Sequence, residues 1–273
     1  MAIFHESIPK AQIEWILAQK VFWVATAPLS KDGNVNVSPK GGPYFGIPDE
    51  RTFWYMDLSG SGIETISHLH EKGNGRITIM FSAFEGPPKI FRLWGKGRVI
   101  ENGTKEFQDF ITKHSITTIP GSRSIIVVDV HQAGSSCGFS VPFYEFKEHR
   151  TVLNDFFSNR EKRFKEGKKE ESIDRYWAYK NAWSMDGLPG LERALVTGKV
   201  EHVEPIKKMV GPHAPTRYYA PATYGLKQLM FVAVICLLLG AALVQYRIEY
   251  SGWVTERIQQ LVGFLNPEEM VRP

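Results

Sequence analysis

The sequence contains few cysteines and none of the common catalytic motifs. Its 273 residues include two cysteines, Cys137 and Cys236, which lie far apart, so we expect a reducing compartment and no disulfide framework. No G-x-S-x-G elbow, P-loop or zinc-ligand spacing is present. Cys137 has no accompanying histidine or C-x-x-C motif, and we interpret it as a half-buried residue in a turn. The N-terminus lacks a basic stretch followed by an apolar core, so no secretory signal is expected.

A large excess of charge of one sign is also missing. The net charge is +4 and the basic excess is spread along the chain, so nucleic-acid binding is not expected. The densest run of charges, residues 160–171, holds six basic and four acidic side chains and is interpreted as a solvated helix face or loop. His68 and His70 are two residues apart on a predicted helix, so they point in different directions. We interpret them as surface residues rather than as a metal pair.

One long apolar run is present. Residues 229–244 carry no charge and would span about 24 Å as a helix, and residues 226–246 are long enough to cross the roughly 30 Å hydrocarbon core. Lys227 and Tyr246, near its two ends, suit the membrane interface. The alternative is a buried core helix, but the run is apolar on every face. We therefore predict one transmembrane helix.

Strand-like segments dominate the first half of the chain. Six are predicted, at residues 21–27, within 30–42, and at 51–58, 75–84, 89–101 and 123–132. Helices are predicted at residues 11–21, 63–72 and 104–115, and a charged helical stretch at 153–183. Because few helices separate the strands, the pattern favours a mainly β (α+β) fold with an antiparallel sheet or small barrel over a doubly wound parallel sheet.

The short stretch SGSG, residues 59–62, separates a predicted strand from a predicted helix. Glycine lets an anion approach the backbone, serine hydroxyls donate hydrogen bonds, and a helix N-terminus carries partial positive charge, so a phosphate could bind here. Ser61 and Glu64 also fit a capping box, which needs no ligand. The G-x-G-x-x-G dinucleotide fingerprint is absent. The stretch by itself fits a cap and a phosphate site equally well.

Two further stretches carry polar residues that suit a phosphorylated, aromatic ligand. Ser38 and Lys40 lie at the end of the second predicted strand, in NVNVSPKGG. Arg92 and Trp94 share one face of the fifth predicted strand, in RLWGKGRV, and Leu93 lies on the other face. Lysine and arginine neutralise phosphates, and an aromatic ring can border a flat heteroaromatic ring. Each residue also has an ordinary structural explanation as a surface lysine, a paired arginine or a core tryptophan.

The order of these segments resembles a known family. VFWVATAP, GNVNVSPKGG, FWYMDLSGSGIETISHL, GRITIMF and IFRLWGKGRV, read in that order, resemble the pyridoxamine 5′-phosphate oxidase family of FMN-binding split barrels. The resemblance covers about residues 8–132. The segments SCGFSVPF and KNAWSMDGLPGL resemble a C-terminal extension found in one branch of uncharacterised, largely microbial members.

The resemblance implies a six-stranded FMN-binding split barrel with flanking helices. It also implies a homodimer, with the flavin in a groove between the two subunits. Carried over by position, the residues that it implies for cofactor binding are Ser38, Lys40, Ser59, Gly60, Ser61, Gly62, Thr65 and Arg92.

The chain departs from the family pattern at two places. Many members carry a Ser-Arg-Lys triplet after the turn, where this chain has Ile63, Glu64 and Thr65. A phosphate would then depend on backbone N–H groups, hydroxyls and Lys40, and FMN binding would weaken unless Glu64 points away. The family's oxidases also carry a C-terminal Arg-x-His element that contacts the pyridoxal substrate. No such element follows residue 133, so pyridoxamine phosphate oxidation is not expected.

Two functional hypotheses result. The first is an FMN-dependent oxidoreductase that acts on a small-molecule substrate, with NAD(P)H as electron donor and the flavin carrying the chemistry. The alternative is a split barrel without redox activity, either a module that binds a flavin, a deazaflavin or haem, or a membrane-anchored interaction protein. The loss of two cations at Glu64 and Thr65 motivates this alternative. No side chain is singled out as a catalytic acid or base.

The predicted organisation has five parts. They are a flavin-binding split barrel at residues 1–133, a helical and turn-rich extension at 134–195, a proline-rich linker at 196–225, a transmembrane helix at 226–246 and a short tail at 247–273. Basic residues are more frequent before the apolar run than after it. This predicts a single-pass protein of the endoplasmic reticulum or mitochondrial outer membrane, with the bulk of the chain in the cytosol.

Overall fold

The chain forms two units, Met1–Tyr219 and Ala220–Pro273. The computed structural model describes residues 2–212, 214 and 226–264. The first unit contains the sheet and all of the predicted site residues, and the second unit consists, in its described part, of one long helix.

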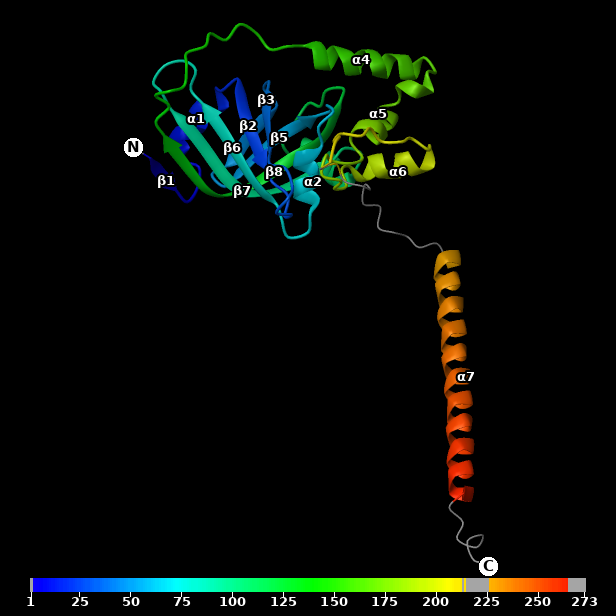
Figure 1. The fold of residues 1–273 in the computed structure, drawn as a ribbon. Coiled ribbons are helices and arrows are strands. Elements are labelled where there is room, and N and C mark those ends of the chain that lie inside the picture. Colours follow the sequence, from blue (N-terminus) through cyan, green and yellow to red (C-terminus); the bar gives the residue numbers. More distant parts are fainter. Residues whose placement is uncertain (1, 213, 215–225, 265–273) are drawn as a thin grey trace, which may run out of the picture. The chain divides into compact units, whose positions relative to one another are not determined.

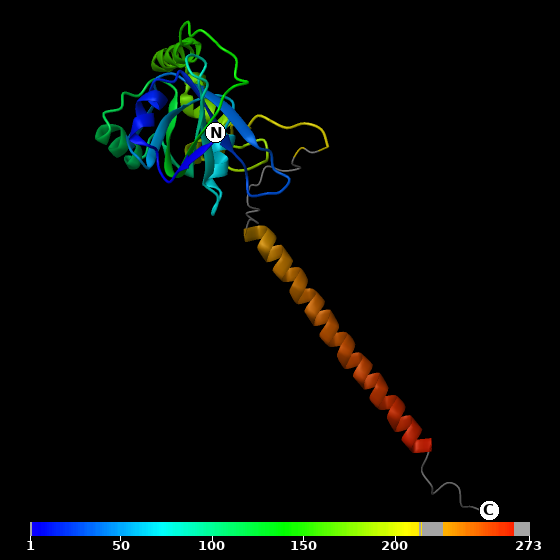
Figure 2. The ribbon, with the colours of Figure 1, turned by 90° about the vertical axis from the view of Figure 1, so that its left-hand side faces the viewer.

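Eight antiparallel strands form one curled sheet in the described part of the first unit (Figures 1 and 2). They are β1 (Ile3–His5), β2 (Val21–Thr26), β3 (Asn36–Gly41), β4 (Phe45–Asp49), β5 (Thr52–Leu58), β6 (Arg76–Ser82), β7 (Ile90–Glu101) and β8 (Ser122–Ser136). The order across the sheet is β3-β2-β6-β7-β8-β5-β4, and β1 pairs with β8. The sheet curls into a half-barrel, and the predicted antiparallel α+β class is confirmed.

All six predicted strands are present, and two strands were missed. β1 is only three residues long, and β4 contains glycine and proline, which are poor strand formers. Both therefore lack the alternating apolar signal that marks the longer strands. The predicted count of six is wrong for this reason.

The helices are α1 (Lys10–Leu17), α2 (Glu64–His70), α3 (Lys105–Lys113), α4 (Val152–Lys165), α5 (Ile173–Lys180) and α6 (Glu192–Val200), with a 3-10 turn at Lys169–Glu171. The predicted helical stretch 153–183 is divided because Gly167, with a φ of 98°, ends α4 in a left-handed conformation. The predicted boundary at residue 195 falls inside α6.

Two apolar clusters pack against opposite faces of the sheet. The larger fills the inside of the curl and includes Phe22, Phe53, Phe81 and Phe91, all of them buried. The smaller lies on the outer face beneath α3 and is centred on Phe107. The alternation of buried and half-buried residues in β2 follows the two-residue period of a strand with one face in the core.

The described part of the second unit is α7 (Leu226–Phe264). Among the described residues, Ala233–Gln260 is long and apolar enough to cross a membrane, and an 18-residue window within it has a mean hydropathy of 1.4. The helix begins at the first residue of the predicted span and continues past residue 246, where that span was predicted to end. Residues 247–264 of the predicted tail belong to α7, whereas residues 265–273 of the tail, and residues 213 and 215–225 of the predicted linker, lie outside the described residues.

Candidate functional site

The Ser59–Gly62 turn leaves the sheet at the end of β5 and leads into α2. The β5–β8 register shifts after Asp57, which interrupts the regular ladder at this point. Ser61 and Gly62 are exposed, and a Cβ built on Gly60 would meet no atom within 4 Å. The backbone N–H groups of Gly60, Ser61 and Gly62 make no hydrogen bond to any described residue. The turn therefore presents open backbone donors.

Two cations meet on one buried carboxylate beside this turn. Lys40 Nζ on β3 lies 2.9 Å from Asp57 Oδ1, and Arg123 Nε on β8 lies 2.7 Å from Asp57 Oδ2. Arg123 Nη1 also donates to the Gly62 carbonyl at 2.6 Å, which ties the turn to β8. Side-chain exposure is 1% for Asp57, 5% for Arg123 and 22% for Lys40, so Lys40 is the member of the triad that solvent or a ligand can reach.

The charge state of this triad follows from its geometry. Burial by itself would raise the pKa of Asp57, but attraction to Arg123 and then to Lys40 outweighs burial and lowers the pKa to about 2. The carboxylate is therefore ionised at neutral pH, and with two cations attached the triad has an excess of positive charge.

Two buried hydroxyl groups adjoin the triad, those of Tyr55 and Ser124. Neither has a hydrogen-bond partner among the described residues. Ser124 stands opposite Asp57 in the β5–β8 ladder. Burial, followed by the negative charge of Asp57, raises the pKa of Tyr55, so its hydroxyl stays protonated and can donate. Unpaired buried hydroxyls are uncommon and mark places where a water molecule or a ligand can bind.

The C-terminal extension, residues 134–195, closes one side of the Ser59–Gly62 turn. Trp177 Nε1 donates to Ser59 Oγ at 2.7 Å, and Asn181 Nδ2 donates to the Gly60 carbonyl at 2.8 Å. Ser59 is fully buried under these contacts. Its hydroxyl therefore supports the turn from within the chain instead of facing solvent with Ser61.

Glu64 does not point away from the turn but folds back onto it. Its Oε2 accepts the Ile63 N–H at 2.9 Å, and its Oε1 accepts the Met185 N–H at 3.3 Å and lies 3.7 Å from Lys208 Nζ. The predicted capping box is wrong, because Ile63 is the cap residue of α2 and no side chain caps the helix. Ser61 stays exposed, and the Glu64 carboxylate binds the N–H of its own neighbour.

Ser38 and Thr65 join the site through Asn36. Ser38 Oγ donates to Asn36 Oδ1 at 3.2 Å, and Asn36 Nδ2 donates to Thr65 Oγ1 at 3.0 Å. This chain of hydrogen bonds links β3 to α2. The structure thus brings Ser38, Lys40, Thr65 and the turn into one region.

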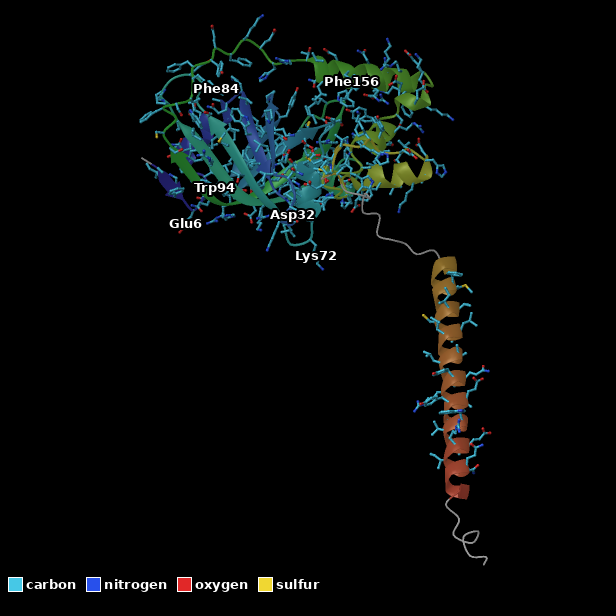
Figure 3. All side chains as sticks on the ribbon, in the orientation of Figure 1. Glu6, Asp32, Lys72, Phe84, Trp94 and Phe156 are labelled. Atoms are coloured by element: carbon cyan, nitrogen blue, oxygen red, sulfur yellow. The ribbon has the colours of Figure 1, made fainter. Side chains whose placement is uncertain are left out.

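Arg92 lies apart from the other predicted site residues. It stands opposite Gly134 on β8, whereas the last residue of β5 stands opposite Ser122. These two β8 positions are twelve residues apart, about 40 Å along an extended strand. Figure 3 shows Trp94, which shares a half-exposed face of β7 with Arg92, well separated from Lys72 just after α2. One chain does not bring Arg92 to the turn.

One of the two histidines is buried, contrary to prediction. His68 is fully buried, its Nδ1 lies 2.9 Å from Thr26 Oγ1, and its Nε2 has no hydrogen-bond partner among the described residues. Burial lowers the pKa of His68, so the ring is neutral at pH 7. His70 is exposed, as predicted. The two rings therefore point to different sides of the short helix, and the His70 ring lies 3.1 Å through its Nδ1 from the Gly190 carbonyl.

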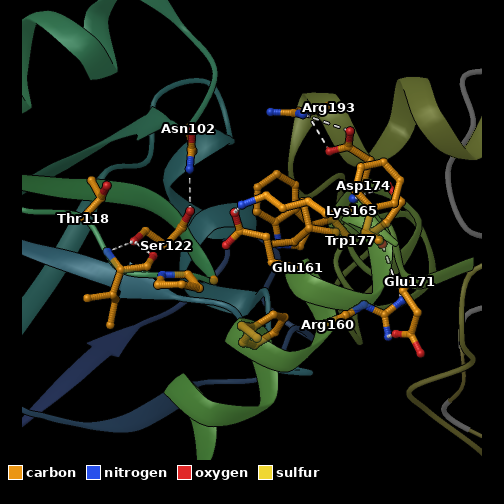
Figure 4. Close-up of a pocket in the computed structure, with 17 residues that line it drawn as sticks. Asn102, Thr118, Ser122, Arg160, Glu161, Lys165, Glu171, Asp174, Trp177 and Arg193 are labelled. Atoms are coloured by element: carbon orange, nitrogen blue, oxygen red, sulfur yellow. Dashed lines mark hydrogen bonds and ion pairs between the residues drawn. The ribbon is translucent and has the colours of Figure 1, made fainter. Parts of the chain in front are cut away.

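A cavity of about 560 Å³ lies between the extension and the loop before β8 (Figure 4). Trp177 lines this cavity, and so does Gly121, whose carbonyl accepts the Ser59 N–H at 2.7 Å. Its charged side chains pair with one another, for example Arg193 Nε with Asp174 Oδ1 at 2.7 Å. None of the predicted cofactor residues lines it. It adjoins the turn from the side of the extension.

Sequence reasoning missed four residues that shape this site: Asp57, Arg123, Trp177 and Lys208. A signal existed for the first two, because each is a charge within or beside an apolar strand, in RTFWYMDL and RSIIVVDV. No local pattern marks Trp177 or Lys208, whose contacts with Ser59 and Glu64 join segments more than a hundred residues apart.

The fold and the site define an α+β protein with a curled antiparallel sheet and a cationic triad beside a serine–glycine turn. The family model for Pyridoxamine 5′-phosphate oxidase matches residues 8–137. The pyridoxamine 5′-phosphate oxidase family protein ustO of Aspergillus flavus is 36% identical over 204 residues, which cover 71% of this chain and 80% of ustO. The chain belongs to the pyridoxamine 5′-phosphate oxidase family.

Solved structures similar to this chain match about half of it. HupZ of Group A Streptococcus is 20% identical, with a TM-score of 0.37, over 47% of this chain and 99% of HupZ. An FAD-binding protein of Mesorhizobium loti is 13% identical, with a TM-score of 0.31, over 50% of this chain and 97% of that protein. The similarity to ustO covers more of the chain than either of these, and reaches past residue 137.

Proposed function

We propose that the chain binds FMN at the Ser59–Gly62 turn and acts as a flavin-dependent oxidoreductase. The observation that carries this proposal is the pair of cations, Lys40 and Arg123, held on Asp57 beside a turn with open N–H groups. Cations and backbone N–H groups are the usual protein partners of a phosphate. Family membership supports a flavin, because the sequence resembles the FMN-binding split barrels.

The donors present fit a phosphate. In this proposal the phosphate is held by Lys40 and by the N–H groups of Gly60, Ser61 and Gly62, with Ser38 and Thr65 at the border of the site. Arg123 fixes the positions of Gly62 and Asp57 and adds positive charge. The bound flavin would supply hydride or electron-pair transfer, taken from NAD(P)H and passed to a small-molecule substrate. The chain would bind the flavin, orient it and exclude water from one side.

We further propose that the working unit is a homodimer. Arg92, on β7, pairs with Gly134 near the end of β8 that is far from the turn, so in this proposal the second copy brings its Arg92 to the flavin. The stretch between β8 and α4 has no helix or strand and exposes Phe139, Phe143 and Tyr144 to 82%, 79% and 61%. A run of exposed aromatic residues is typical of a surface that a partner covers.

Membrane attachment through α7 is the third part of the proposal. The apolar stretch of this helix, Ala233–Gln260, supports a single span, with the first unit in the cytosol at the endoplasmic reticulum or mitochondrial outer membrane. Deleting residues 226–273 should move the protein from the membrane pellet to the supernatant. A truncated chain that still pellets with membranes would show that the helix is not the anchor.

Anaerobic spectroscopy tests the redox part. The full chain, purified in detergent and loaded with FMN, should lose its oxidised-flavin absorbance when NADH or NADPH is added, and regain it with an electron acceptor. Bound flavin that neither donor bleaches would favour the alternative of a binding module without redox activity. The folding of Glu64 onto the turn is the observation that favours this second function, because it places a negative charge beside the N–H groups that a phosphate would use.

A further inference from the structure

A set of hydrogen-bond donors beside the Ser59–Gly62 turn binds a carboxylate of the same chain, that of Glu64. The Glu64 carboxylate receives the Ile63 N–H at 2.9 Å and the Met185 N–H at 3.3 Å, and Lys208 Nζ lies 3.7 Å away. Two backbone N–H groups and an ammonium converging on one group are the partners of a bound anion. Glu64 and Lys208 are only 14% and 12% exposed, so the pair is largely withdrawn from solvent.

The three donors come from distant parts of the chain. Ile63 follows the turn, Met185 belongs to the extension, and Lys208 follows α6. Burial lowers the pKa of Lys208 to about 8, although the attraction of Glu64 acts in the opposite direction. The ammonium is therefore still mostly protonated at neutral pH, and it restores near the turn one of the cations that positions 64 and 65 lack.

A phosphate and the Glu64 carboxylate cannot both lie close to this turn without strong repulsion, because two like charges a few ångströms apart in a half-buried site repel each other. The Ile63 N–H can serve only one of them. The side chain of Glu64 is long enough to swing outward, and its departure would free the Ile63 and Met185 N–H groups and remove the carboxylate from beside Lys208.

Resting on the proposed function, we propose that Glu64 determines the ligand specificity of this site as an internal anion. It competes with the ligand's phosphate for the donors at the turn, and so reduces the preference for a phosphorylated flavin over the same flavin without phosphate. Lys208 is the cation that the phosphate takes over when Glu64 is displaced.

Paired titrations test this specificity role. FMN and riboflavin, which differ by the phosphate alone, are titrated into the full chain in detergent and followed by flavin fluorescence. Glu64→Gln removes the charge and should raise the affinity for FMN about tenfold, while the riboflavin affinity changes less than about twofold. The matched control is Glu106→Gln, an exposed glutamate on α3 that pairs with Arg98, and it should leave the ratio of the two affinities unchanged. An unchanged ratio in Glu64→Gln would overturn the proposal.

Inorganic phosphate separates this inference from the proposed flavin function. At constant ionic strength, phosphate should raise the unfolding temperature of Glu64→Gln and leave the unsubstituted chain and Glu106→Gln unaffected. If neither chain binds a flavin but phosphate still stabilises Glu64→Gln, then the flavin proposal fails and the internal anion stands. If phosphate stabilises all three chains equally or none of them, the internal anion is refuted. Should Glu64→Gln fail to fold, Glu64→Ala is used with the same criteria, because it also removes the charge.

Discussion

The two ends of β8 carry two halves of the predicted site, and they are built differently. At the Ser122 end, Arg123 is buried, paired with Asp57 and bonded to the turn, and the extension covers the same region. At the Ser136 end, Arg92 is half-exposed and donates a single hydrogen bond, at 3.3 Å, to the Ser136 hydroxyl. Arg123 at one end is held by buried contacts within the chain, whereas Arg92 at the other end is partly accessible to solvent.

Because of this difference, the two ends of β8 should contribute differently to the stability of the fold and to ligand binding. Removing a partner from a buried ion pair leaves an uncompensated charge, whereas removing a half-exposed side chain leaves a group that water can solvate. Substitutions at the turn end should therefore affect folding as well as binding. Substitutions at the Arg92 end should affect binding alone, and only in an assembly of two copies.

Asp57→Asn should produce the largest effect. It leaves Lys40 and Arg123 without their shared carboxylate in a buried site, which costs about 3–5 kcal/mol of unfolding free energy. Chemical denaturation of the full chain in detergent measures the loss. Asp129→Asn, on the same sheet but exposed, is the control and should stay within about 0.5 kcal/mol of the original chain. A loss of less than 1 kcal/mol in Asp57→Asn would show that the triad does not stabilise the fold.

The pH dependence of unfolding provides a second view of the triad. Folding lowers the pKa of Asp57 to about 2, whereas an aspartate in the unfolded chain has a pKa near 4. The ionised Asp57 therefore stabilises the fold fully above about pH 4, and this stabilisation is lost as the pH falls from about 4 to 2. The loss amounts to about 2–3 kcal/mol for a shift of this size. Asp57→Asn should lack this component of acid sensitivity. An acid profile identical to that of the original chain would contradict the assignment.

Lys40→Met should weaken FMN binding about tenfold, since it removes the most accessible cation near the turn, while riboflavin binding changes little. Folding should survive, because Asp57 keeps its bond to Arg123. Lys10→Met is the control, because Lys10 is 85% exposed and pairs with Glu50 away from the turn. Equal loss of FMN and riboflavin affinity would mean that Lys40 does not contact the phosphate.

Trp177→Phe keeps an aromatic ring but removes the indole N–H that Ser59 accepts. The buried Ser59 hydroxyl loses a partner, at a cost of about 1 kcal/mol in unfolding free energy. Trp23→Phe on β2 is a matched change at a half-buried position away from the extension and should cost less. If Trp177→Phe destabilises the chain no more than Trp23→Phe, the extension does not hold the turn through this bond.

Arg92→Ala should have the smallest effect on stability, within about 0.5 kcal/mol, yet it should weaken flavin binding by the dimer. Co-expression with Lys40→Met provides the sharper test. A mixed dimer combines an intact Lys40 from one copy with an intact Arg92 from the other, and should regain one binding site in two. If mixed dimers bind flavin no better than the dimer of either single variant, then Lys40 and Arg92 do not act at a shared site.

The sequence was sufficient to predict the antiparallel α+β fold and six strands, because alternating apolar residues report which face of a strand is buried. β1 is too short for that signal, and the glycine and proline of β4 interrupt it. At the site, the structure brings Ser38, Lys40, Thr65 and the turn into one region, and their role in cofactor binding stays a prediction. The orientation of Glu64 could not be predicted from the sequence, because its partners Met185 and Lys208 are supplied by tertiary contacts that no local pattern encodes.

Equilibrium titration of FMN into the full chain is the most direct test of the central claim that the Ser59–Gly62 turn and its cationic triad hold a flavin phosphate. The account predicts saturable binding at one FMN per chain, weakened by Lys40→Met and unchanged by Lys10→Met. A folded chain, verified by a cooperative unfolding transition, that binds no FMN at any concentration would contradict it.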